Sequence, residues 1–206
     1  MAGNSLLETN LDFSLTFFSK LLHEEEIEHF IFFGTLLGLT RDGMPIKGDD
    51  DIDFYVNKIN FDKVCNALLS IGVNINHNAW PNHTKNFIQV NDNIDGKEIR
   101  VDFYFYDSVS DKDYLLEPWN FAGLAPNATS VTTFLKVPKI FIYPISIKNY
   151  LGEKIFIPKH PEIMCEFLYG QSWKIPKSKG IDYKTTVIGG KPIHYSMKGG
   201  NITIHG

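Results

Sequence analysis

The chain has 206 residues, 43% of them hydrophobic, which is enough to bury the core of one domain of ordinary size. Its 20 lysines and arginines against 24 aspartates and glutamates give a net charge of −4, which excludes a basic groove for nucleic acid. The two cysteines, Cys65 and Cys165, lie in apolar helical patterns and are expected to be reduced and buried. The apolar runs are too short and too interrupted to cross a membrane, and residues 1–9 lack the pattern of a secretory signal. We therefore expect a cytoplasmic protein.

The first part of the chain alternates predicted helices and strands. Apolar residues at helical spacing predict an amphipathic helix over residues 11–22. Residues 29–33 favour a strand that ends at Gly34, and residues 36–39 then predict a brief helix. Residues 51–56 alternate in polarity, which predicts a strand with one apolar and one acidic face.

The remaining elements complete an α/β, or α+β, pattern. We expect a helix at 60–70 with Asn60 as its N-cap, strands at 73–75, 87–90 and 98–106, a strand pair at 139–147 and 153–157, and a helix at 161–169. The strand at 98–106 places Asp102, Tyr104 and Tyr106 on its polar face. Together they predict a mixed β-sheet flanked by helices in one domain over residues 1–206, with a core at about 10–110 and a C-terminal extension at about 111–206.

Four aspartates crowd into five positions: Asp49, Asp50, Asp51 and Asp53. Each ionised carboxylate raises the cost of ionising its neighbours, and a divalent cation relieves that cost. On an extended chain Asp49, Asp51 and Asp53 project to one face, while Asp50 points elsewhere. Mg²⁺ suits such a site because it takes carboxylate oxygens and is commonly shared with substrate phosphates. A solvated acidic loop is the alternative interpretation.

Two further features flank this acidic run. Upstream, Gly34 and Thr35 open a predicted helix, where backbone N–H groups and the helix dipole can hold a phosphate. Downstream, Asp102 adds an isolated carboxylate on a later strand, for which a structural pair with Arg100 or a lysine is the alternative. This order of features resembles the DNA-polymerase-β-like nucleotidyltransferases.

A narrower resemblance rests on several motifs. The segment 33–41, then Pro45 and the run 49–53, is similar to the signature of the LicD family, which includes bacterial phosphorylcholine transferases and is related to fukutin-type ribitol-phosphate transferases. Val101-Asp102-Phe103 resembles the family's later acidic strand, and the segment 169–173 resembles its closing Tyr-Gly-x-x-Trp segment. The resemblance implies a nucleotidyltransferase-like fold.

The resemblance also implies roles for individual residues. The implied metal ligands, for Mg²⁺ or Mn²⁺, are Asp49, Asp51, Asp53 and Asp102, of which Asp51, Asp53 and Asp102 also serve catalysis. The implied substrate-binding residues are Gly34, Thr35, Arg41 and Lys47. A pair with Asp42 is the alternative for Arg41. Lys47 is otherwise a loop charge, and it follows Pro45 and Ile46 in a stretch where family members commonly carry Pro-Trp.

The expected function follows from this resemblance. It is Mg²⁺-dependent transfer of a phosphorylated small alcohol, such as phosphocholine or a polyol phosphate, from a CDP-activated donor to a hydroxyl of a glycan or glycoconjugate. Polysaccharide modification in the cytoplasm, or at the membrane surface where glycans are assembled, is the implied setting. Transfer of a nucleoside monophosphate from NTP, and a non-catalytic module that binds nucleotide or glycan, are the alternatives. A polar loop with His77, His83 and Lys85 is a weaker candidate for acceptor or nucleotide binding.

Overall fold

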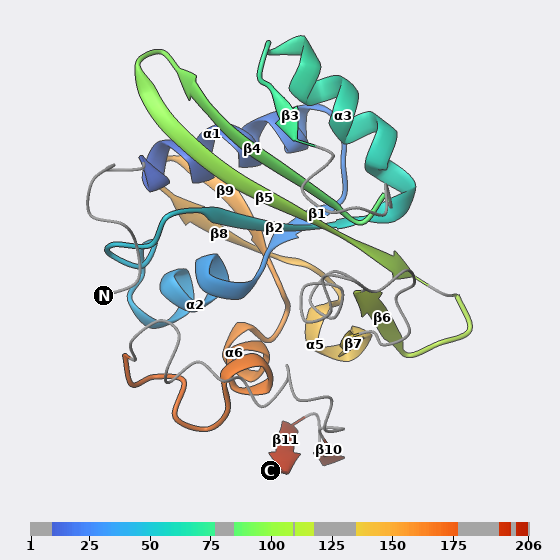
Figure 1. The fold of residues 1–206 in the computed structure, drawn as a ribbon. Coiled ribbons are helices and arrows are strands. Elements are labelled where there is room, and N and C mark those ends of the chain that lie inside the picture. Colours follow the sequence, from blue (N-terminus) through green and yellow to red (C-terminus); the bar gives the residue numbers. More distant parts are fainter. Residues whose placement is uncertain are drawn as a thin grey trace, which may run out of the picture.

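The structure is a computed structural model, and it describes residues 10–76, 85–108, 110–117, 135–176, 194–198 and 201–205. Its centre is a seven-stranded mixed sheet (Figure 1). The main path of this sheet runs β1 (His29–Ile31), β2 (Ile52–Asn57), β5 (Lys97–Ser108), β4 (Phe87–Ile94), β3 (Ile75–Asn76). The pair β2–β5 is parallel, and the other pairs on this path are antiparallel. This mixed sheet with flanking helices confirms the predicted fold class.

Further strands lie outside that path. The long strand β5 also pairs with β6 (Tyr114–Glu117), which in turn pairs with β7 (Leu135–Pro138). Two separate hairpins are formed by β8 (Ser146–Tyr150) with β9 (Glu153–Ile157) and by β10 (His194–Lys198) with β11 (Asn201–His205). The β8–β9 hairpin belongs to the main body, because β9 packs against both α1 (Leu11–Glu24) and β1.

The helices cover the sheet and support its acidic end. Besides α1, they are α2 (Phe33–Arg41), the 3₁₀-helix η1 (Lys58–Asn60), α3 (Phe61–Ser70), α5 (Lys139–Ile142) and α6 (Pro161–Tyr169). α1 packs against β5, whereas α2 packs against β2 and α6, so in Figure 1 α2 lies under β2 and α6 under α2. α2 is therefore packed between β2 and α6, which comes from a later part of the chain.

Aromatic side chains form much of the core on both faces of β2. On one face Phe54 stacks on Phe103 with ring centroids 5.6 Å apart, and on the other Tyr55 stacks on Phe32 at 4.1 Å. Tyr55 is fully buried and Asp53 is only 5% exposed. The second face of β2 carries Asp53, as predicted, but it is buried together with Tyr55 because α2 and its neighbours cover it.

Most predicted elements are confirmed, and two need correction. The strand expected at 29–33 ends at Ile31, because Phe33 already begins α2. The helices expected at 11–22, 60–70 and 161–169 correspond to α1, α3 and α6, and Asn60 is the N-cap residue of α3 without a side-chain capping bond. The strand expected at 139–147 is instead the helix α5 followed by β8. α5 buries Phe141 and Ile142, and Pro144 has no N–H to contribute to a strand ladder. The strand therefore begins only after this proline.

Candidate functional site

Two neighbouring parallel strands carry the central carboxylates of the site. In the β2–β5 register Asp53 lies directly beside Asp102. Residues at matching positions of adjacent strands project to the same face, so both carboxylates enter the same space. Each is 5% exposed, which is unusual for an aspartate unless a partner or a ligand compensates the charge.

The segment just before β2 adds the other carboxylates. Carboxylate oxygens of Asp51, Asp53 and Asp102 lie within 4.8 Å of one another, and so do those of Asp49, Asp50 and Asp51. Asp51 belongs to both groups. Carboxylate oxygens gathered in this way could hold a divalent cation, so both groups are candidate metal sites. The acidic run and the isolated Asp102, which are 49 residues apart at their nearest, therefore meet in one place.

The start of α2 is attached to these carboxylates. The backbone N–H of Asp53 donates to Thr35 Oγ1 at 2.8 Å, and the backbone N–H of Thr35 donates to Asp53 Oδ2 at 3.4 Å. A Cβ at Gly34 would come within 2.9 Å of Asp49 Oδ2, so only glycine allows this approach. Phe33, which precedes it, has φ of +39°, a strained backbone for a bulky residue. The turn that opens α2 is thus held tightly against the acidic residues.

The electrostatics of the site favour a cation. Burial, and then the negative charges of Asp51, Asp102 and Asp49, raise the pKa of Asp53 well above its ordinary value. Burial also raises the pKa of Asp102 to about 6, although a hydrogen bond from Gln89 and the charge of Arg100 oppose this shift. A divalent cation among these carboxylates would compensate their mutual repulsion and lower both pKa values.

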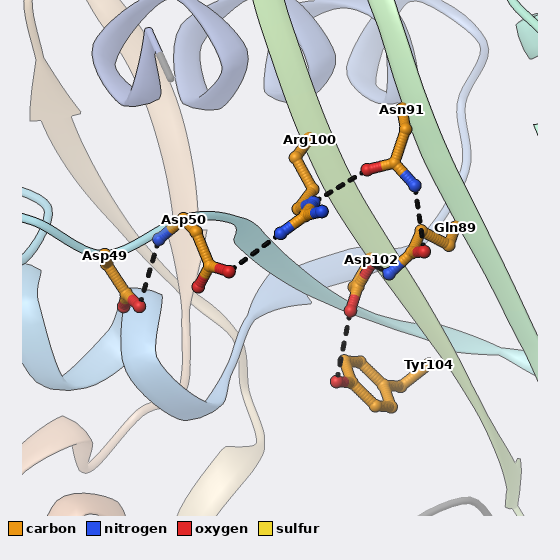
Figure 2. A network of polar contacts seen from close by, with 7 residues as sticks. All are labelled: Asp49, Asp50, Gln89, Asn91, Arg100, Asp102 and Tyr104. Atoms are coloured by element: carbon orange, nitrogen blue, oxygen red, sulfur yellow. Dashed lines mark hydrogen bonds and ion pairs between the residues drawn. The ribbon is translucent and has the colours of Figure 1, made fainter. Parts of the chain in front are cut away.

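Polar side chains on β4 and β5 surround Asp102 (Figure 2). Gln89 Nε2 donates to Asp102 Oδ1 at 3.0 Å, and the Tyr104 hydroxyl lies 3.5 Å from Asp102 Oδ2. Arg100, the expected alternative partner of Asp102, instead donates to Asp50 Oδ2 at 2.7 Å. Gln89 was not among the residues predicted from the sequence, and the alternating polar residues of β4 were the signal that could have drawn attention to it.

The other predicted residues have contacts or positions of their own. Arg41 is at the opposite end of α2 from Gly34, and its guanidinium donates to Asp42 at 2.7 and 2.9 Å. Lys47 is exposed in the loop before the acidic run. Lys85 forms an exposed ion pair with Asp62 at 2.7 Å.

Some predicted residues have structural roles or fall outside the described part of the chain. Tyr106 is fully buried and donates to Glu28 at 3.0 Å, so it does not line the site as Tyr104 does. His77 and His83 lie outside the described residues. Both cysteines are free thiols, Cys165 buried and Cys65 half-buried. None of the described helices has the length and apolar character that a membrane crossing requires.

The fold places the protein among nucleotidyltransferase-fold proteins. A similar solved structure is the crystal structure of the lincosamide antibiotic adenylyltransferase LnuA with lincomycin bound. The two have a TM-score of 0.53 and 15% sequence identity, over 83% of this chain and 92% of that chain. At this identity the likeness concerns the fold.

The family follows from the sequence itself. The LicD family model, described as "LicD/FKTN/FKRP, nucleotidyltransferase domain", matches residues 26–160, and the chain belongs to this family. A search of curated proteins found no match. Family and fold together indicate a transferase.

Proposed function

We propose that the protein transfers a phosphorylated small alcohol, such as phosphocholine or a polyol phosphate, from a CDP-activated donor to a glycan hydroxyl. The observation that carries this proposal is the meeting of Asp51, Asp53 and Asp102 within 4.8 Å at the end of two parallel strands. Membership of the LicD family supports the class of reaction. Glycans under assembly in the cytoplasm or at its membrane surface would be the acceptors.

In this proposal Asp51 and Asp53 hold Mg²⁺, with Mn²⁺ as a substitute, and Asp49 and Asp102 complete the ligand set. When bound, the cation neutralises charge on the donor phosphates and on the departing CMP. Asp102 takes the proton of the acceptor hydroxyl. The hydroxyl oxygen then forms a bond to the transferred phosphorus as the bond from phosphorus to CMP breaks. CMP leaves with the electron pair of that bond.

The turn at the start of α2 is the proposed place for the donor phosphates. Gly34 allows close approach of the chain to the carboxylates, and the backbone at the start of a helix favours anions. Thr35 is proposed to hold this turn in place, since both its hydroxyl and its backbone N–H already bond to Asp53. Arg41 and Lys47 are proposed to contact outer parts of the donor.

Substitution of the proposed metal ligands tests the mechanism. Asp51→Asn and Asp53→Asn should each abolish release of CMP from CDP-choline or CDP-ribitol in saturating Mg²⁺, while the fold stays intact. Asp62→Asn is the matched control, because its side chain is 75% exposed in a surface ion pair. Full activity of either site variant would refute the assigned roles.

Nucleotidyl transfer is the second candidate function. The solved structure with a similar fold is that of an adenylyltransferase for a lincosamide antibiotic. The same carboxylates would then bind the metal of an NTP, and the reaction would release pyrophosphate. Incubation with labelled donors separates the two reactions. Release of CMP from a CDP-alcohol supports the first function, and release of pyrophosphate from NTP supports the second.

A further inference from the structure

A continuous hydrogen-bonded network connects Asp102 to the acidic run before β2 (Figure 2). Gln89 lies directly opposite Asp102 in the antiparallel β4–β5 pair, and Asn91 lies opposite Arg100. Because residues two apart on a strand share a face, these four side chains form one polar row. Arg100 extends the row to Asp50 at 2.7 Å, and the backbone N–H of Asp50 donates to Asp49 Oδ1 at 3.2 Å.

The hydrogen bonds within this row fix the orientation of its side chains. Arg100 Nε donates to Asn91 Oδ1 at 2.7 Å, which orients the Asn91 amide so that its Nδ2 donates to Gln89 Oε1 at 2.9 Å. The Gln89 amide is thereby oriented in turn, with its Nε2 donating to Asp102 Oδ1 at 3.0 Å. A cationic donor at the head of such a chain strengthens every bond in it. Flipping either amide would break two bonds at once.

This orientation leaves the two oxygens of Asp102 in different states. Oδ1 accepts the short bond from Gln89, whereas the Tyr104 hydroxyl lies at the long distance of 3.5 Å from Oδ2. Oδ2 therefore keeps the capacity to bind a cation or accept a proton. At the other end of the row, the ion pair with Arg100 engages Asp50 Oδ2 and compensates the charge of Asp50, which also lies in the candidate group with Asp49 and Asp51.

We propose that Gln89, Asn91 and Arg100 are positioning residues, which present Asp102 Oδ2 to the metal and keep Asp50 out of the ligand set. This inference rests on the proposed function, since it assigns these residues to the same site. Partners of metal ligands typically change metal affinity or activity by about 10- to 100-fold when they are removed. A structural role alone would change stability and leave metal affinity intact.

The test measures Mn²⁺ and Mg²⁺ affinity by calorimetry on the full chain, together with turnover of the CDP-alcohol. Gln89→Leu should weaken metal binding and lower kcat about 10- to 100-fold, with the KM for the donor within about threefold of wild type. Asn91→Ala should also weaken metal binding and lower kcat, by a smaller factor. Asn93→Ala is the matched control, because Asn93 is an exposed asparagine two residues after Asn91 on β4, and this variant should behave as wild type.

The second part of the test uses variants of the acidic run. Asp50→Asn retains an oxygen for Arg100 and should keep metal affinity within about threefold of wild type, whereas Asp51→Asn should lose it about 100-fold or more. Wild-type affinity in both Gln89→Leu and Asn91→Ala, or equal losses in Asp50→Asn and Asp51→Asn, would overturn the positioning role alone. A wild-type protein that binds neither metal would overturn the proposed function together with this inference. Metal binding without turnover of any CDP-alcohol would overturn the proposed donor, and the affinities would still decide the role of the network.

Discussion

Asp102→Asn should stabilise the metal-free protein at neutral pH, although Asp102 is proposed to serve catalysis. Burial raises the pKa of this carboxyl from 3.8 to about 6. A shift of about two units at about 1.4 kcal/mol each amounts to about 3 kcal/mol of lost folding stability above pH 6. Asparagine removes this cost and keeps an oxygen to accept from Gln89. For a chain of this length the gain corresponds to a melting temperature higher by about 6 to 12 °C.

The sign of the pH dependence provides the assay. The native state holds the Asp102 proton more tightly than the unfolded state, so wild-type stability is lost as pH rises from about 4 to about 6. Thermal and urea unfolding in EDTA should therefore show little advantage of Asp102→Asn at pH 4 and the full advantage at pH 7.5. Mg²⁺ at 100 times its Kd should add about 2.7 kcal/mol to wild type and less to the variant. A variant no more stable than wild type at pH 7.5 in EDTA would refute the reasoning.

Further predictions concern the turn of α2, the core and the hairpin. Gly34→Ala should fold and lose metal affinity, because its Cβ meets only the end of a carboxylate side chain at 2.9 Å; wild-type affinity in a metal titration would contradict this. Gly38→Ala should unfold at much lower urea concentration, because its Cβ would meet backbone atoms at 2.7 and 2.8 Å. Burial lowers the pKa of His29 to about 4, so the folded protein loses stability as pH falls from about 6.5 to 4. His29→Phe should remove about 3 kcal/mol of this pH dependence of the unfolding free energy. An unchanged dependence in the variant would exclude His29 as its source. Lys148→Met should cost about 1 kcal/mol of unfolding free energy, because its ammonium donates to a carbonyl in the last turn of α2 at 2.6 Å, whereas exposed Lys154→Met should cost little.

Local patterns in the sequence were sufficient for most elements and for the acidic candidates. The apolar stripe of residues 11–22 and the Pro161 and Gly170 boundaries of α6 are local signals, because helix periodicity and capping depend on near neighbours. The motifs around Gly34 and Asp49–Asp53 identified the family, which the match over residues 26–160 confirms. The fold class and the family could therefore be predicted from the sequence alone, together with the carboxylates that offer candidate ligand atoms, whereas metal binding by them stays a prediction.

Which of those atoms meet depends on the tertiary structure. The partner of Asp102 depends on the registers of β5 with β2 and with β4, which are set by pairings across long stretches of chain. These registers place Asp53 and Gln89 on either side of Asp102 and direct Arg100 to Asp50. Burial of Asp53 and Asp102, and the rise in their pKa values, likewise arise only when α2 and the sheet close around them. The local sequence determines which side chains are available, whereas their burial and the distances between them depend on the assembled fold.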